Sequence, residues 1–213
     1  MNSHNLDTSF TTLADVSETI RFLLEKRIKE KFTDITVSLD SPKKIEENSK
    51  TDKNLISVYL YRVSENEAMK NNPALILNKD KSKPAPLALD LYFMITPYGI
   101  DENNKLAFLG RTMQILYDNS VLKGTILKDA SIIKLTGSTP DSNIIDDTNN
   151  LVGSTKELRI TYNPLTQETI TQIWQALEVP MRLAVFYLVT PVEIESTLEI
   201  EGKRIIERAL RKK

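Results

Sequence analysis

The chain has 213 residues, of which 28 are basic and 29 are acidic, and its formal net charge is -1. A chain this close to neutral carries no global charge that would attract nucleic acid or an anionic membrane. No apolar run approaches the roughly 18 residues that cross a bilayer, and the polar residues at 1–9 lack the apolar segment of a secretory signal. We therefore expect the chain to assemble in the cytoplasm of its producer and to leave it by lysis or within a larger particle.

Two residue types that carry much of enzyme chemistry are nearly missing. Cysteine is absent, and His4 is the only histidine. These facts exclude disulfides, thiolate nucleophiles, cysteine-based zinc sites, histidine triads and histidine clusters. The sequence contains neither a P-loop nor a GxGxxG fingerprint. We therefore predict that the chain is not an enzyme and has no catalytic residue, no cofactor and no metal.

The first third of the chain predicts a helix and two strands. Apolar residues at helical spacing predict a helix over 12–31, and a short strand follows over 35–39. The charged stretch 41–54 indicates a surface loop. The β-branched and aromatic run LISVYLYRV predicts a central strand over 55–63, and 66–72 is predicted as a single helical turn.

The middle of the chain predicts a strand and a second helix. A polar loop at 78–83 precedes the run LALDLYFMIT at 87–96, whose apolar residues alternate as in a half-buried strand. A helix is predicted over 103–119, with a stripe made of Leu106, Leu109, Met113 and Leu116. Gly110 would cost this helix about 1 kcal/mol relative to alanine. Either the helix tolerates this glycine, or a neighbouring backbone comes very close to it.

The last third contains a long loop, two strands and a third helix. Glycine, serine, proline and asparagine dominate residues 136–156, which we predict to be a loop. A strand follows over 158–162, and Thr166 is a good N-cap for a helix that carries Trp174 on its apolar face. A long strand over 181–194 has Pro191 near its end, which predicts a sheet edge or a bend there. From about Lys203 the chain is basic and indicates a short amphipathic helix.

The order of these elements defines the expected fold class. Strands are sometimes consecutive, so a regular βαβ alternation fails. We predict an α+β fold, with a mixed or mostly antiparallel sheet packed against two or three helices and with long surface loops. We expect a single domain over residues 10–196 and a basic C-terminal tail over residues 197–213.

Several polar residues are candidates for chemistry, and for each we favour a structural explanation. Asp90 lies mid-strand among apolar residues; we expect a solvated face or an ion pair with Arg62 or Arg111 rather than a functional acid. Two acidic pairs lack the calcium-loop pattern and are expected to be solvated loop charge: Asp101–Glu102 and Asp146–Asp147. The basic tail lacks the interleaved aromatic residues that stack on bases, so we predict no nucleic-acid partner.

Five segments in chain order carry a resemblance to a known family: TLADVSETIRFLLEK, ISVYLYRVSENEAMKNN, PLALDLYFMITPYG, LAFLGRTMQILYDNSVL and ELRITYNPLTQETITQIWQALEVPMRLAVFYLVTPVEIES. Together, over about residues 13–196, they resemble the cap, or tail-terminator, proteins of extracellular contractile injection systems of the antifeeding-prophage and virulence-cassette type. The ordered set is specific, although no single motif is diagnostic. The chain departs from the family pattern at Lys70, where an arginine is expected before Asn71, and by an apparent insertion at 137–153. Some relatives also carry an extra C-terminal domain.

The resemblance implies a structural protein that forms a six-fold ring on the distal end of an inner tube and touches the last sheath ring. The implied partners are other copies of this chain, the tube protein and the sheath protein, with no direct membrane insertion. The alternatives are a baseplate or sheath adaptor, a cargo adaptor inside the tube, and a small carboxylate hydrolase or nuclease. The candidate interface residues are Arg62, Asn66, Lys70, Asn71, Pro191, Arg204, Arg208 and Arg211.

The joining of such a ring to its partners is expected at strand edges and long loops. The candidates are the strand that ends near Pro191, the loop 136–156 and the basic tail. Strand addition supplies main-chain hydrogen bonds with little demand on sequence. The tail is expected to meet an acidic rim on the tube or the sheath.

Overall fold

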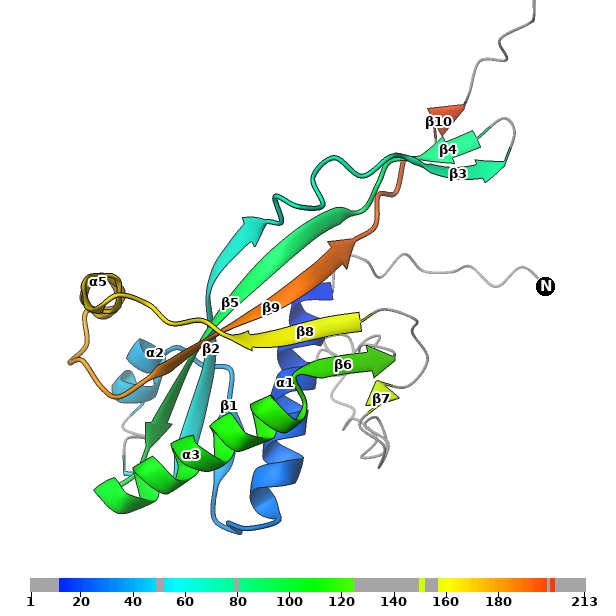
Figure 1. Ribbon diagram of the computed structural model, residues 1–213. Helices are drawn as coiled ribbons and strands as arrows, with labels where there is room; N and C mark the ends of the chain where they lie inside the picture. The colour runs from blue at the N-terminus through cyan, green and yellow to red at the C-terminus, as the bar shows by residue number, and fades with distance from the viewer. Residues whose placement is uncertain are drawn as a thin grey trace, which may run out of the picture.

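The computed structural model describes residues 12–48, 52–78, 81–124, 150–151, 157–198 and 200–201. The helices in these ranges are α1 (Thr12–Lys29), α2 (Pro42–Glu47), α3 (Glu102–Asp118) and α5 (Gln167–Leu177). The strands are β1 (Thr36–Ser38), β2 (Leu55–Glu65), β3 (Leu75–Asn78), β4 (Lys81–Lys83), β5 (Leu87–Tyr98), β6 (Val121–Gly124), β7 (Asn150–Leu151), β8 (Glu157–Tyr162), β9 (Val185–Ile194) and β10 (Ile200–Glu201). They form a large sheet in the order β1-β2-β5-β9-β8-β6-β7 and a small sheet in the order β10-β4-β3 (Figure 1).

The large sheet is mixed and mostly antiparallel. The pairs β1–β2 and β6–β7 are parallel, whereas the other four neighbouring pairs are antiparallel. The long strands β2, β5 and β9 run side by side, and the small sheet lies beyond their far ends (Figure 1). The predicted α+β class with a mixed sheet is confirmed.

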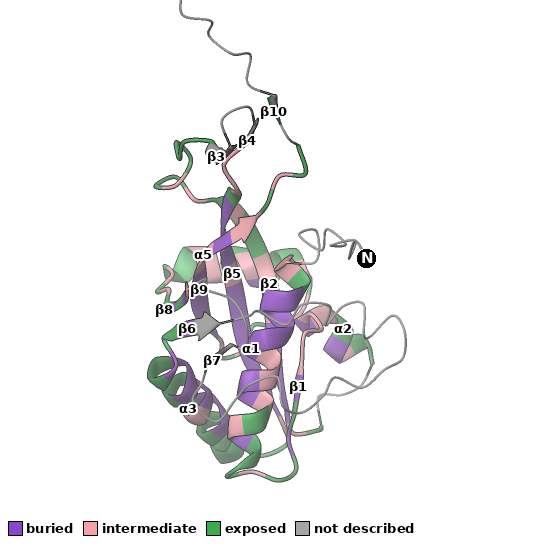
Figure 2. Ribbon diagram, turned by 90° about the vertical axis from the view of Figure 1, so that its right-hand side faces the viewer, coloured by how far each residue is buried: buried purple, intermediate pink, exposed green. Residues whose placement is uncertain are grey.

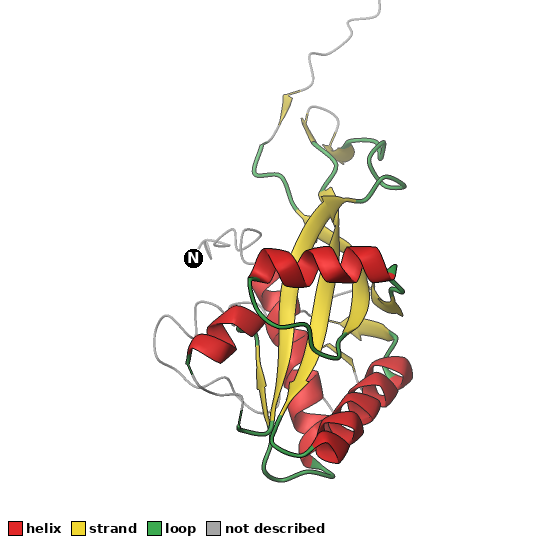
Figure 3. Ribbon diagram, turned by 90° about the vertical axis from the view of Figure 1, so that its left-hand side faces the viewer, coloured by secondary structure: helices red, strands yellow, loops and turns green. Residues whose placement is uncertain are grey.

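Helices cover both faces of the large sheet. The helices α1 and α3 lie on one face (Figure 2), where their apolar side chains join alternate residues of β5, such as Leu91 and Phe93, in the main core cluster. The helices α2 and α5 lie on the opposite face (Figure 3). There Trp174 of α5 packs with Met94 and Phe186, and Ile45 of α2 forms a smaller cluster with Leu55 and Tyr98. The sheet is therefore the middle layer of three.

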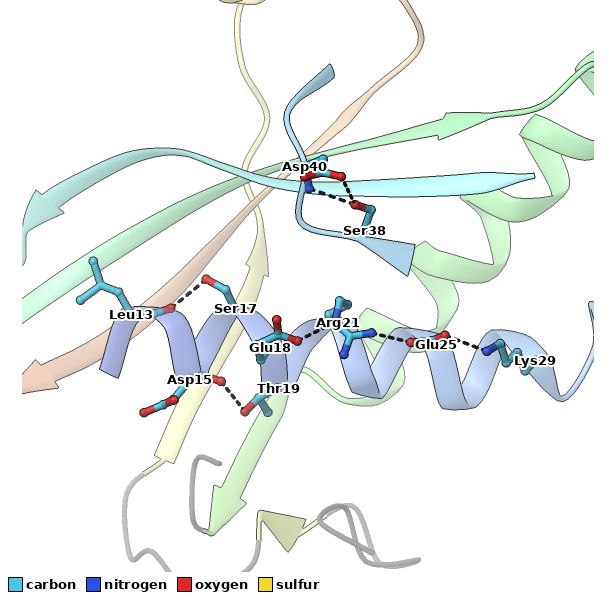
Figure 4. Close-up of polar contacts among 10 residues, drawn as sticks. All are labelled: Leu13, Asp15, Ser17, Glu18, Thr19, Arg21, Glu25, Lys29, Ser38 and Asp40. Carbon is cyan, nitrogen blue, oxygen red and sulfur yellow. Dashed lines mark hydrogen bonds and ion pairs between the residues drawn. The ribbon is translucent and has the colours of Figure 1, made fainter. Parts of the chain in front are cut away.

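The polar side chains of α1 form a ladder of ion pairs (Figure 4). Arg21 lies 2.6 Å from Glu18 and 2.5 Å from Glu25, and Lys29 continues the ladder at 2.7 Å from Glu25. Glu18 and Asp15 are each only 4% exposed. The structure therefore buries the Glu18 carboxylate and pairs it with the Arg21 guanidinium.

Two of the predicted loops contain regular structure, so those predictions are wrong. Within 41–54, Ser41 caps α2 by accepting a hydrogen bond from the Lys44 backbone N–H at 3.3 Å, and Pro42 occupies the first turn. Ile45 is then buried at 1% exposure. Within 78–83, β4 pairs with β3 and also with β10.

The helix α3 differs from its predicted apolar stripe. Leu109 and Leu116 are buried as predicted, but Leu106 is 56% exposed and Met113 is 36% exposed. The buried side instead includes Phe108, Thr112 and Ile115. Apart from the adjoining backbone of α3 itself, no described atom lies within 4 Å of the position where a Cβ on Gly110 would stand. The helix therefore tolerates this glycine, and the alternative of a close backbone approach is wrong for the described part of the chain.

The remaining elements follow the sequence closely. The predicted helix 12–31 and the strands 55–63, 87–96 and 158–162 correspond to α1, β2, β5 and β8. Thr166 caps α5 by accepting from the Thr169 backbone N–H at 3.3 Å. The last strand begins at Val185 rather than at 181. Residues 66–72 form hydrogen-bonded turns. The loop 136–156, except for β7, and the tail from Lys203 lie outside the described residues.

Candidate interaction surfaces

A β-bulge interrupts the pairing of β9 with β5. Leu89 pairs with Val192 and Leu91 pairs with Val189, so three steps along β9 match two steps along β5. The extra residue falls at Thr190–Pro191, and it keeps both valines on the buried face, at 1% and 0% exposure. Pro191, expected at an edge or a bend, lies at this irregularity.

A small polar network ties three strands together beside the bulge. The Thr190 hydroxyl donates to Asp90 Oδ1 at 2.5 Å, and Asn66 Nδ2 donates to the same oxygen at 2.8 Å and to Thr190 Oγ1 at 3.0 Å. Asn66 Oδ1 also accepts from the Met69 backbone N–H at 3.1 Å, and the Asn66 N–H donates to the Ala88 carbonyl. This network, which we call the Asn66 network, fixes the turn after β2 to β5 and to the bulge of β9.

Of the two explanations offered for Asp90, a solvated face or an ion pair, the ion pair with Arg62 or Arg111 is wrong. The Arg62 guanidinium lies 4.9 Å from the centre of the Tyr92 ring. Arg111 donates to the Arg27 carbonyl in the last turn of α1 and lies 3.2 Å from Glu30, which directly follows that helix. Asp90 instead takes both of its side-chain hydrogen bonds from neutral donors.

The candidate interface residues separate into three groups. Asn66 and Pro191 lie at the Asn66 network, while Lys70 and Asn71 lie on the exposed turn that Asn66 anchors. Lys70 is 3.1 Å from the Glu65 carboxylate. Arg62 lies on β2 shortly before this turn. Arg204, Arg208 and Arg211 lie outside the described residues.

Sequence reasoning missed Thr190 as a member of this network. Its partner Asp90 is 100 positions away, and Asn66 is 124 positions away. No local pattern connects such residues. The one available signal was an asparagine directly after a strand, because asparagine favours turns by bonding its own backbone two or three residues on.

A short connection is fastened over the α2 side of the sheet. The residues 178–184 join α5 to β9, and ion pairs Lys43–Glu178 and Arg182–Glu46 tie them to α2, the second at 2.9 Å. The Arg182 guanidinium lies 5.4 Å from the centre of the Tyr98 ring. Burial raises the pKa of the Tyr98 phenol, and Arg182 opposes part of that rise.

The described part of the chain offers strand edges rather than an ion-binding cluster. It holds no group of three or more His, Cys, Asp or Glu placed to bind a metal ion, and none of its helices combines the length and apolarity of a membrane span. Asp101 accepts from the Asn103 backbone N–H at 3.3 Å as the N-cap of α3, a structural role. The pair Asp146–Asp147 lies outside the described residues.

In the described part of the chain, the long strands β2 and β9 each have a stretch that lacks a neighbouring strand on one side. The strand β1 pairs with β2 only along residues 55–57, so the outer side of β2 from Val58 to Glu65 has no strand beside it in the described part of the chain. The strand β8 pairs with β9 only along residues 187–190. From Pro191 onward, β9 is therefore paired as a strand with β5 alone. Such edges are templates for an added strand.

This arrangement of sheet and helices is similar to two solved terminator structures. One is the PVC sheath/tube terminator of an extracellular contractile injection system in its extended state, with a TM-score of 0.58 and 14% identity; the match covers 93% of this chain and 59% of that chain. The other is the tube-terminating cap of the anti-feeding prophage, with a TM-score of 0.58 and 15% identity; it covers 91% of this chain and 58% of that chain. The chain thus spans less than two thirds of either protein and shares the fold of these terminators.

The chain belongs to the Pvc16 N-terminal domain family, which matches residues 15–208. No curated protein matches it significantly. The family resemblance predicted from the five sequence segments is therefore confirmed.

Proposed function

We propose that the chain is a structural cap that ends the inner tube and the sheath of a phage-tail-like contractile injection particle. The observation that supports this most is the family match over residues 15–208, together with the fold shared with two structures described as a sheath/tube terminator and a tube-terminating cap. The chain acts by presenting surfaces and catalyses no reaction. It assembles in the cytoplasm and leaves the cell as part of the particle.

The cap is a closed ring of six copies. Each copy offers one surface to the next copy and a different surface to the previous one, which is a heterologous interface that closes on itself. The open edges of β2 and β9 support joining to tube or sheath by strand addition. The residues Arg62, Lys70 and Asn71 lie on or directly after β2 and form part of that surface. The loop 136–156 and the basic tail with Arg204, Arg208 and Arg211 are further joining segments.

The first experiment is deletion of the gene in its own producer, followed by negative-stain electron microscopy of the particles. Tubes of uncontrolled length, or sheaths missing or unstable at one end, are expected. Normal particles of normal length would contradict the cap and favour a cargo adaptor. Complementation with a chain that stops after Glu201 then tests the tail; unchanged incorporation into particles would remove the tail from the interface.

A further inference from the structure

The helix α3 carries an apolar stripe on its exposed side. Leu106, Gly110, Met113 and Tyr117 follow the spacing i, i+4, i+7 and i+11, which places them along one side of a helix. Tyr117 is 81% exposed and Leu106 is 56% exposed. The residues that α3 buries in the core, such as Phe108 and Ile115, lie on another side. The stripe is therefore not the core-facing side of this helix.

The direction of the stripe follows from what the rest of α3 contacts. Arg111 Nη2 donates to the Arg27 carbonyl and to Glu30, both at 3.2 Å, so this side of α3 is occupied by α1. The stripe residues are turned away from Arg111 around the helix. They therefore lie on a different side of α3 from the one that contacts α1.

The same face of the sheet also exposes apolar side chains. Ile160 and Val185 belong to the core cluster that α3 covers. Tyr162 stands two residues after Ile160 in β8, and strand alternation puts it on that same face, where its ring centre lies 5.7 Å from that of Tyr187. Leu183 lies in the connection just before β9, between Arg182 and Ala184, which contact the α2 and α5 side of the sheet. Continuing the alternation of β9 by two residues turns Leu183 toward the α3 side. Tyr162 and Leu183 are nevertheless 51% and 53% exposed. Because α3 contacts both β5 and β8, we define the α3 patch as Leu106, Gly110, Met113, Tyr117, Tyr162 and Leu183.

The α3 patch is large and carries no charged side chain. Scaled by full areas of roughly 200 Å² for large side chains, its exposed fractions amount to roughly 600 Å² of mostly apolar surface. This area is at the upper end of the range for the largest apolar patch on a typical monomer, which is about 300–600 Å². A stable interface buries about 800 Å² on each partner, and permanent contacts between identical subunits are the more apolar ones. The patch alone supplies most of the area that a contact between copies needs.

We propose that the α3 patch is the surface through which one copy of this chain contacts the next copy. This inference rests on the proposed ring, and it names the residues of the contact between its subunits. Gly110 lies within the stripe, and apart from the adjoining backbone of α3 no described atom lies within 4 Å of a Cβ position there. The missing side chain lets a partner backbone approach α3 closely, as tightly packed helices do at about 8–10 Å between axes.

Gly110 allows the folding of one chain to be separated from the contact between chains. Gly110→Ala meets nothing in its own chain and removes a poor helix former, so it should raise Tm by about 2–4 °C. Gly110→Gln is also a better helix former, but its longer side chain stands where the partner would lie. It should keep the Tm of the single chain at or above the wild-type value while it abolishes the contact.

The experiment places the photo-crosslinking residue p-benzoylphenylalanine at Tyr117 of the full chain, expressed in the producer. We expect a product with twice the mass of the 24.2 kDa chain. The same residue placed at the exposed neighbour Asp118, on another side of the helix, should give no such product. Gly110→Gln combined with the Tyr117 probe should lose it.

The outcomes separate this inference from the proposed function. Crosslinks from position 117 to a tube or sheath protein, or no crosslink although the chain sediments with particles, would overturn the contact between copies. Persistence of the doubled product in Gly110→Gln would overturn it as well. If the doubled product forms but deletion leaves particles normal, the contact stands and the cap function fails.

Discussion

The Asn66 network gives a stability prediction whose magnitude can be worked from its hydrogen bonds. Asn66→Ala removes two donor bonds, to Asp90 and Thr190, and one acceptor bond, from the Met69 backbone N–H. A typical bond contributes about 1 kcal/mol net, and one to a charged group about 1.5–3 kcal/mol. Asp90 keeps its bond from Thr190 at 2.5 Å, so the loss is partial. We expect the free energy of unfolding to fall by about 2–3 kcal/mol.

The assay is equilibrium unfolding in urea, followed by the fluorescence of the single tryptophan, Trp174, which is 2% exposed in the folded chain. Asn71→Ala is the matched control, since Asn71 is an exposed asparagine on the same turn and should change stability by less than about 0.5 kcal/mol. A double-mutant cycle with Thr190→Ala should show a coupling energy of about 1 kcal/mol. Equal effects of Asn66→Ala and Asn71→Ala would refute the idea that the network holds the three strands.

Three further predictions test other parts of the fold in the same assay. Wild-type stability should fall as pH rises above about 10, because burial raises the pKa of Tyr98 and the unfolded chain loses the phenol proton first. Tyr98→Phe should weaken that fall and leave neutral-pH stability nearly unchanged, because the buried hydroxyl has no hydrogen-bond partner among the described residues. An unaltered dependence of stability on pH above about 10 would show that Tyr98 does not cause the fall. Ile45→Ala should lower the free energy of unfolding by about 2–4 kcal/mol, because the Ile45 side chain is buried beneath α2. A loss near zero would mean that residues 41–54 behave as a surface loop. Arg21→Ala should lower the free energy of unfolding by about 2 kcal/mol, because it removes the ion-pair partner of the buried Glu18. Arg27 is more exposed, so Arg27→Ala should lower it by less than about 1 kcal/mol. Equal losses would contradict the idea that burial strengthens the Arg21–Glu18 pair.

The sequence predicted the elements that build the core, because burial imposes periodicity. For this reason, the alternating apolar residues of β5 and the helical spacing of apolar residues in α1 predicted both elements correctly. The helix α2 was missed although Ser41 and Pro42 are a sound start signal, because its six residues contain one buried isoleucine in a charged stretch. The small sheet was missed because β4 is the polar sequence KSK, and a strand away from the core need not alternate.

The stripe of α3 shows why apolar residues alone do not identify the buried side of a helix. Leucines and methionine recur on two sides of α3, and only the structure reveals that Phe108 and Ile115 take the core positions while Leu106 does not. The fold of the family could be predicted from the ordered segments. The pairing of Asn66 with Asp90 and Thr190 could not, because it depends on a bulge between distant strands.

The position of β9 in the large sheet has a consequence for synthesis on the ribosome. β9 lies between β5 and β8, yet it is the last strand of that sheet along the chain. Until it emerges, β1-β2-β5 and β8-β6-β7 are two separate pieces, and β5 and β8 each present an open edge that invites pairing with other chains. Domains generally fold as units during translation, so this one should complete its sheet late. A nascent chain stalled before Val185 should be insoluble and sensitive to protease, whereas one stalled well beyond Ile194 should resist it.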